Sequence, residues 1–345
     1  MITFTIPTWN RKEKLRVCLQ SLIEQIKTIN ERILIAVYNN ASDDGTEIVL
    51  KEFKENHPEI IKYITGSDHV RGEESFKRAF LLADTEWMWM FGDDDILVSG
   101  GLVEVVSLLK RKDVDFIHAA EKSRVSGENR IYNATLLDLC QGFGFVEMTG
   151  FISGNIARTK KLHEVLNGEF VEIYRDASYF QSLILLDAFA SSKAAFINAP
   201  IIDLQNNEQT AETGGRWLKE DVAIRYVNIA DGLASLVERG KIPSELTEEF
   251  FRYLSGNLFG KIMYNFYEHC LVKNNHIESE YWERLYKLVA MLPETERIRE
   301  TKVIDGFNKA LREWMDSVLC TAKALIRVQE AHEPATIKEY PFTYT

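Results

Sequence analysis

Three consecutive aspartates, Asp93, Asp94 and Asp95, follow an apolar stretch at residues 87–91 and a single glycine. Adjacent carboxylates repel one another and lose hydration when a fold brings them together, so a nearby cation should compensate them. A divalent metal with phosphate oxygens would do so, because Mg²⁺ prefers oxygen ligands. The residues also fit a second interpretation, in which a polar turn leads into a helix beginning near Ser99 and one aspartate is its N-cap.

The apolar stretch before the aspartates is short and aromatic-rich, which predicts a strand buried on both faces. Strand-like and helix-like segments alternate over the first 118 residues with short connections, and this predicts a parallel, doubly wound sheet. Ligands of such sheets bind at the carboxyl ends of the strands, where the aspartates fall. The expected strands are residues 2–6, 33–37, 60–64, 87–91, 114–118, 152–158 and 194–202, with an apolar helix at 180–189 and a looser pattern at 123–154.

Polar turns follow the first and second predicted strands, at residues 8–11 and 39–46, on the same edge as the aspartates. No Gly-x-Gly-x-x-Gly follows the first strand and no Gly-Lys-Ser/Thr P-loop is present, which disfavours a dinucleotide-binding or P-loop fold. A nucleotidyltransferase would need a glycine-rich signature with Lys or Arg after the first strand, and residues 8–11 do not supply it.

The composition limits the class of protein. The 345 residues, 46% of them apolar, suffice for one large domain and a smaller one. The formal net charge of −11 argues against nucleic-acid binding. No stretch approaches the roughly 18 apolar residues of a membrane span. The chain opens on a strand-like run, and four scattered cysteines suggest reduced thiols, so we expect no signal peptide and a cytoplasmic location.

The character of the sequence changes after Arg216, where apolar residues recur at helical spacing. We expect a helical region at residues 216–332 and a peripheral tail at 333–345. Packing against the first domain is the main expectation for the helices. A homodimer seam and a peripheral contact with the membrane are alternatives, although net acidity works against anionic lipid.

Three motifs, at residues 6–11, 39–46 and 91–97, resemble in order and spacing those of the family 2 glycosyltransferases. The resemblance covers roughly residues 2–210. It implies a GT-A fold over residues 1–215, a mixed, mostly parallel α/β sheet flanked by helices. It also implies a UDP-, GDP- or dTDP-linked sugar donor and Mg²⁺ or Mn²⁺ as the cofactor.

The resemblance assigns nucleotide-binding positions. Pro7, Thr8, Asn10 and Arg11 belong to the loop that lies against the base and ribose in this family. Asn39 stands where the family usually has an aspartate that holds the base. A carboxylate only accepts hydrogen bonds, whereas an amide both donates and accepts, so this departure leaves the base open.

Other positions carried over from the family concern the phosphates and the metal. Arg71 sits where the family often presents a basic residue near the nucleotide, and a solvated loop arginine is the alternative. The aspartates resemble the DXD motif, which implies that Asp93 and Asp95 ligate the metal and that Asp94 contacts the donor. The usual motif begins one position earlier, so which two of the three ligate stays open.

Asp176, after Arg175, resembles the family's later acidic motif, which supplies the catalytic base. In an inverting transfer this base removes the acceptor hydroxyl proton as oxygen attacks the anomeric carbon. There are two alternatives: Asp176 is only an N-cap residue, or Asp187 is the base. Residues 214–217 partly match an acceptor motif of processive synthases, and we interpret them as a lid in which Arg216 meets the diphosphate, or else as an interdomain linker.

Together these features predict a metal-dependent, inverting glycosyltransferase. It would move a single sugar from a nucleotide-diphospho-sugar to a hydroxyl of a surface-glycan or lipid-linked acceptor, in polysaccharide biosynthesis. We expect a cytoplasmic protein, peripheral at the inner face of the membrane, with no nucleic-acid partner. The alternative is a non-catalytic nucleotide-sugar-binding or scaffold protein with a GT-A domain.

Overall fold

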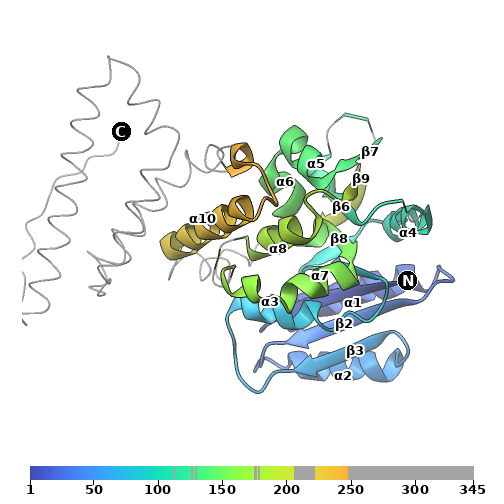
Figure 1. Ribbon diagram of the computed structural model, residues 1–345. Coiled ribbons are helices and arrows are strands. Elements are labelled where there is room, and N and C mark those ends of the chain that lie inside the picture. The colour runs from blue at the N-terminus through green and yellow to red at the C-terminus, as the bar shows by residue number, and fades with distance from the viewer. Residues whose placement is uncertain are drawn as a thin grey trace, which may run out of the picture. The chain divides into compact units, whose positions relative to one another are not determined.

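The computed structural model describes residues 1–111, 113–125, 127–128, 130–174, 177, 179–205 and 222–247. Within them the centre is a mixed sheet with strand order β3-β2-β1-β4-β8-β6-β9-β5, and β7 pairs with β9 (Figure 1). Helices pack around this sheet, as the predicted GT-A architecture requires.

The first half of the sheet confirms the predicted alternation. Its four parallel strands are β1 (Ile2–Thr8), β2 (Ile33–Asn39), β3 (Ile61–Thr65) and β4 (Trp87–Met90). They are connected by α1 (Lys12–Ile26), α2 (Thr46–Asn56) and α3 (Gly72–Phe80). The chain steps outward from β1 to β3 and then crosses back to β4, so right-handed crossovers place α3 on the opposite face from α1 and α2.

The second half of the sheet adds antiparallel strands to the parallel series. Its elements are β5 (Asp95–Leu97), α4 (Gly101–Arg111), β6 (Phe116–Glu121), β8 (Asn155–Arg158) and β9 (Lys193–Leu204). β8 lies between β4 and β6 and runs antiparallel to both. β6 pairs in parallel with β9, and β5 pairs antiparallel with β9. Since β8 is antiparallel to both β4 and β6, β6 runs in the same direction as β4, and the parallel orientation expected for the strands of the first 118 residues is confirmed. The strand that departs from it there is the unpredicted β5.

The region at residues 123–154, whose sequence pattern is loose, contains regular secondary structure. It contains β7 (Arg130–Thr135), α5 (Leu136–Phe143) and α6 (Phe145–Thr149), and α7 (Thr159–Leu166) and α8 (Phe180–Phe189) follow. β7 pairs only with β9 and buries little, so it lacks the apolar alternation of an inner strand. α5 and α6 are too short to show periodicity. A capping box between Thr135 and Asp138 starts α5.

β4 is fully buried, as its composition predicts. Trp87 and Trp89 have no exposed surface. The Phe4 and Trp89 rings stack with centroids 4.8 Å apart, and Phe91 packs edge-on against Phe4 at 5.5 Å. Trp89 Nε1 donates to the Ser153 carbonyl oxygen at 2.7 Å. This aromatic packing fixes the point at which β4 ends and the aspartates begin.

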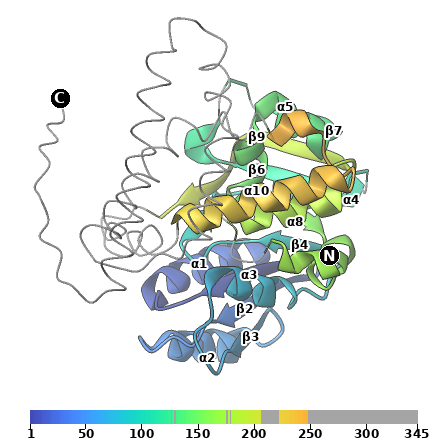
Figure 2. The same ribbon diagram turned by 60° about the vertical axis from the view of Figure 1, so that its left-hand side comes forward.

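α10 (Val222–Glu238) runs beside α8 (Figure 2). The two helices approach closely at Gly232, where a Cβ would lie 2.6 Å from Leu183 Cδ1. Asp187 on α8 is buried and lies 3.0 Å from Arg239 Nη2, and it accepts from the Tyr174 hydroxyl at 2.7 Å. Burial alone would raise the pKa of Asp187, but hydrogen bonds from Arg239 and Tyr174 hold it below its usual value. These contacts give Asp187 a structural role, unlike that of a catalytic base.

Residues 1–215 with 228–250 form one compact unit, and 216–227 with 251–345 form a second. The predicted helical region 216–332 and tail 333–345 lie outside the described residues except for 222–247. In the described part of the chain, no helix has the length and apolarity to cross a bilayer. Two of the four cysteines, Cys18 and Cys140, are described there, and both are buried.

His118 on β6 makes the stability of the fold depend on pH. It is 2% exposed, and burial lowers its pKa to about 4. The unfolded chain binds a proton near pH 6.5, so this contribution is fully present above pH 6.5 and is lost as the pH falls toward 4. Between pH 7.5 and 4.5 we expect a loss of about 2–3 kcal/mol from this residue. Urea unfolding of the wild type and of His118→Gln at both pH values measures it, and an equal pH dependence in both would contradict the assignment.

Candidate active site

The loop after β1 is tied to the loop after β2. Asn10 has a left-handed backbone with φ of 51°, which asparagine tolerates better than most residues. Its N–H donates to Ser42 Oγ at 2.9 Å, and its Oδ1 accepts from the Asp43 N–H at 2.9 Å. Asp44 accepts from the N–H of Lys12, the first residue of α1, at 3.0 Å. The two loops therefore form one connected edge at the carboxyl ends of these strands.

Asp93 lies just beyond β4 and is 4% exposed. Thr8 Oγ1 donates to Asp93 Oδ2 at 2.7 Å, and Arg11 Nη1 donates to Asp93 Oδ1 at 2.9 Å. The same Nη1 donates to Asp94 Oδ2 at 3.1 Å, and Lys14 Nζ lies 3.9 Å from that oxygen. Two cations at the start of α1 thus face the first two aspartates.

Asp95 begins β5 and is held by a different element. Ser153 Oγ donates to Asp95 Oδ2 and accepts from the Gly92 N–H at 2.8 Å. A side chain at Gly92 would not fit, because a Cβ there would lie 2.8 Å from Asp95 Oδ2 and 3.2 Å from Asp94 Oδ1. The carboxylates of Asp94 and Asp95 therefore converge beside the backbone of Gly92.

The nearby cations do not fully offset the charge of the aspartates. Burial raises the pKa of Asp93, although Arg11 and the Thr8 hydrogen bond oppose it. Burial likewise raises the pKa of Asp95 to about 7, against the Ser153 hydrogen bond and with the help of the other two aspartates. A further cation at this cluster would stabilise the charged carboxylates.

The donor set of the cluster suits Mg²⁺ or Mn²⁺. No group of three or more His, Cys, Asp or Glu residues in the described ranges is arranged to hold a metal ion. Mg²⁺ is, however, commonly bound by one or two carboxylates, with substrate phosphates and water completing its shell. None of the described residues donates a hydrogen bond to Asp94 Oδ1 or Asp95 Oδ1.

Asn39 is the last residue of β2 and is fully buried. Its Oδ1 accepts from the Ser42 N–H at 3.2 Å, and its Nδ2 donates to Thr65 Oγ1 at 3.3 Å. It pairs in register with Thr8 on β1 and with Thr65 on β3. Its amide therefore lies on the same sheet edge as Asp93, two strands away.

The loop after β3 is bound to the end of β2 through Asn40. The Val70 N–H donates to Asn40 Oδ1 at 2.9 Å, and Asn40 Nδ2 donates to the Val70 carbonyl oxygen at 2.8 Å. Trp9 packs against His69 of this loop with centroids 4.2 Å apart, and remains 36% exposed. Arg71 follows as the exposed N-cap residue of α3.

Most predicted site residues meet at one edge of the sheet, namely Thr8, Asn10, Arg11, Asn39, Asp93, Asp94 and Asp95. Pro7 lies within β1, and Arg71 lies in the neighbouring loop. Asp176 and Arg216 lie outside the described residues. Lys14 and Ser153 were not predicted from the sequence. Lys14 follows Arg11 by three positions, the spacing of one helix face, so that signal was available.

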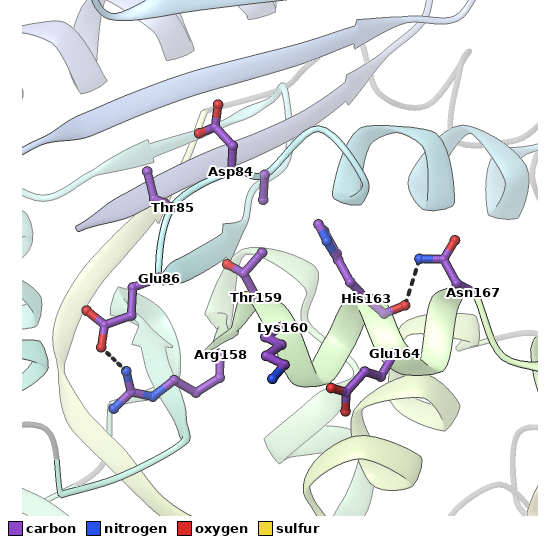
Figure 3. Close-up of a pocket in the computed structure, with 10 residues that line it drawn as sticks. Asp84, Thr85, Glu86, Arg158, Thr159, Lys160, His163, Glu164 and Asn167 are labelled. Atoms are coloured by element: carbon purple, nitrogen blue, oxygen red, sulfur yellow. Dashed lines mark hydrogen bonds and ion pairs between the residues drawn. The ribbon is translucent and has the colours of Figure 1, made fainter.

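A separate pocket of about 750 Å³ lies at the amino end of β4 (Figure 3). Glu86 pairs there with Arg158, and Asn167 Nδ2 donates to the His163 carbonyl oxygen at 2.9 Å. Because ligands of α/β sheets bind at the carboxyl ends of the strands, this pocket is not part of the candidate active site. Its lining residues are Ala83, Asp84, Thr85, Glu86, Arg158, Thr159, Lys160, His163, Glu164 and Asn167.

Two comparisons of sequence agree with this geometry. The sequence model described as Glycosyl transferase family 2 matches residues 3–177, just over half of the chain. Abequosyltransferase RfbV of Salmonella typhimurium is 27% identical over 238 residues, which cover 63% of this chain and 70% of that protein.

Solved structures share the fold. Mannosyltransferase PcManGT from Pyrobaculum calidifontis, in complex with GDP-Man and Mn²⁺, is 15% identical with a TM-score of 0.53 over 95% of this chain and 87% of that one. S. aureus TarS 1-349 in complex with UDP-GlcNAc is 15% identical with a TM-score of 0.57 over 96% and 90%. The described fold matches the GT-A architecture of these enzymes. The family match covers the loops after β1 and β2 and the three aspartates. This chain therefore belongs to glycosyl transferase family 2 and is a glycosyltransferase.

Proposed function

We propose that this glycosyltransferase is metal-dependent and inverting, and that it moves a single sugar from a nucleotide-diphospho-sugar to a hydroxyl of a surface-glycan or lipid-linked acceptor. The observation that carries the proposal is the meeting of Asp93, Asp94 and Asp95 with Arg11 and Lys14 beyond β4. Carboxylates that could bind a metal ion lie there beside cationic side chains that could bind phosphate oxygens. A metal-bound diphosphate requires both kinds of group.

The donor would lie along the carboxyl edge of the sheet. Two strand spacings, about 10 Å, separate β2 from β4, which suits a nucleoside at one end and its diphosphate at the other. Asn39, with Pro7 and Thr8 at the end of β1 and Asn10 in the loop that follows, would hold the base and ribose. Arg11 would contact the phosphates, together with Lys14, Arg71 and Arg216. The nucleotide sugars bound to PcManGT and TarS support this class of donor.

Asp93 and Asp95 are the proposed metal ligands, and Asp94 is a third candidate because no described residue donates a hydrogen bond to its Oδ1. Mg²⁺ or Mn²⁺, when bound, would offset the charge that develops on the leaving diphosphate. Ser153 would keep the Asp95 carboxylate in place through its hydrogen bond. The Mn²⁺ in the complex of PcManGT supports the choice of metal.

Asp176 is the proposed catalytic base, on the strength of its sequence motif. It would take the proton of the acceptor hydroxyl while that oxygen forms a bond to the anomeric carbon. The bond from this carbon to the diphosphate breaks on the opposite face, so the configuration inverts. The acceptor is proposed to be a glycan or glycolipid reached at the cytoplasmic face of the membrane, with the C-terminal helices packing on the catalytic domain or forming a homodimer.

A donor panel tests the proposal. Purified protein is incubated with UDP-, GDP-, dTDP-, CDP- and ADP-linked sugars, with and without EDTA, and the release of the nucleoside diphosphate is measured. We expect turnover of at least one donor, a loss of roughly 100-fold on chelation, and recovery with Mn²⁺. Turnover that is unchanged in EDTA would contradict metal dependence, and donor binding without any turnover would favour a scaffold role.

A further inference from the structure

A buried polar network joins Tyr174, two positions before Asp176 in the sequence, to helices α8 and α10. The Tyr174 hydroxyl donates to Asp187 Oδ2 at 2.7 Å, and Tyr174 has no exposed surface. Arg239 Nη1 and Nη2 donate to the two oxygens of the same carboxylate at 3.1 and 3.0 Å, and Nη2 also donates to the Tyr174 hydroxyl. Lys241 Nζ donates to the Asp187 carbonyl oxygen at 3.1 Å. One residue of α8 therefore ties Tyr174 to the residues that follow α10.

The network defines a single geometry for Tyr174. A buried ion pair adds little stability compared with apolar side chains of similar volume, because both charges lose hydration. Its forked hydrogen bonds do, however, fix the orientation of the groups that they join. Burial and the Asp187 carboxylate raise the pKa of the Tyr174 hydroxyl, so this hydroxyl stays protonated and keeps donating at neutral pH. The contact between Tyr174 and α8 is therefore maintained wherever the enzyme works.

The backbone on either side of Asp176 is held as well. Tyr179 is the N-cap residue of α8 and has a left-handed backbone with φ of 56°, which a bulky residue adopts only where its surroundings hold it. Ala177 is buried, and its N–H donates to the Tyr174 carbonyl oxygen at 3.2 Å. The sequence places Asp176 between Tyr174 and Ala177, so a change in the position of these buried neighbours reaches it through the chain.

We infer that Tyr174, held by Asp187 and Arg239, is a positioning residue for the catalytic base Asp176. The inference rests on the proposed function, in which Asp176 takes the proton of the acceptor hydroxyl. A base must lie within hydrogen-bond reach of that hydroxyl, and a misplacement of about 1 Å can cost roughly 100-fold in rate. Arg239, beyond the catalytic domain predicted at residues 1–215, would thereby support sugar transfer without touching the substrate.

A double-mutant cycle on kcat tests the inference. Tyr174→Phe removes the hydroxyl and leaves the ion pair of Asp187 with Arg239 in place. We expect it to lower kcat for sugar transfer by at least about tenfold and to leave the Kd of the nucleoside diphosphate unchanged, because only the base is displaced. In an Asp176→Asn background the same change should alter the residual kcat by less than about twofold, since no base is left to position.

Thr3→Val is the matched control, since it removes a buried hydroxyl that is hydrogen-bonded to Thr85 Oγ1 at 2.8 Å, near the opposite end of β1. Thr3→Val and Tyr174→Phe each remove a buried hydrogen bond, so both should lower the midpoint of thermal unfolding. Only Tyr174→Phe should change kcat, and Thr3→Val should stay within about twofold of the wild type.

Three results would overturn the positioning role and leave the proposed function intact. They are a wild-type kcat in Tyr174→Phe, an equal fold-loss from Tyr174→Phe in the wild type and in Asp176→Asn, and a loss of kcat in Thr3→Val as large as in Tyr174→Phe. A wild-type kcat in Asp176→Asn would instead overturn the proposed base, and the positioning role with it.

Discussion

Replacing Asp95 with asparagine is expected to lower kcat for sugar transfer by roughly 10³-fold, because the change removes an anionic metal ligand. The asparagine oxygen can still accept from Ser153 Oγ, so the link to the η2 turn (Ile152–Gly154) is preserved. Steady-state kinetics at several Mn²⁺ concentrations should show both the lower kcat and a weaker apparent affinity for the metal.

Asp84→Asn controls for the loss of one negative charge. Asp84 precedes β4 at the opposite end of the strand, is exposed, and lies 2.7 Å from Lys62 Nζ. Surface changes of this kind have small effects, so its kcat should stay within about twofold of the wild type. A wild-type kcat and wild-type Mn²⁺ dependence in Asp95→Asn would remove Asp95 from the metal site.

Asp176→Asn is expected to lower kcat by roughly 10²- to 10⁴-fold and to leave the Kd of the nucleoside diphosphate unchanged. The amide cannot accept the proton of the acceptor hydroxyl, whereas the donor contacts proposed at the end of β4 involve other residues. Kinetics with a transferable acceptor measure kcat, and calorimetry measures Kd.

Glu172→Gln serves as the comparison for Asp176→Asn, because it removes one charge from an exposed residue four positions earlier. Its kcat should remain within about twofold of the wild type. If Asp176→Asn transfers sugar at the wild-type rate, another group is the base. Asp187 is a poor substitute for that role, since Arg239 and Tyr174 already occupy its carboxylate.

The first four strands were predictable because each is an apolar run between short polar connections, and parallel strands with helical crossovers are the packing that such alternation favours. β5 was not predictable. It is three residues long, begins with Asp95, and exists because it pairs with the far end of β9, more than 100 residues later. β7 was missed for a related reason, since an exposed strand at the side of β9 has no apolar face to reveal it.

The candidate site, like the sheet, was predictable from the sequence only in part. Thr8, Asn39 and Asp93 could be placed together because the carboxyl ends of neighbouring parallel strands share one edge of a sheet. The contact between Ser153 and Asp95 could not, because it depends on β8 inserting antiparallel beside β4. Nothing in the local pattern of either segment specifies that neighbour. Long-range antiparallel pairing therefore could not be predicted from the sequence.

The most direct test of the account is anomalous diffraction at the manganese edge from crystals grown with Mn²⁺ and the nucleoside diphosphate that binds most tightly. We expect a peak about 2.2 Å from carboxylate oxygens of the aspartates at residues 93–95, with diphosphate oxygens completing the shell. A diphosphate bound at this edge without such a peak, or a peak elsewhere with Arg11 still joining Asp93 and Asp94, would contradict it.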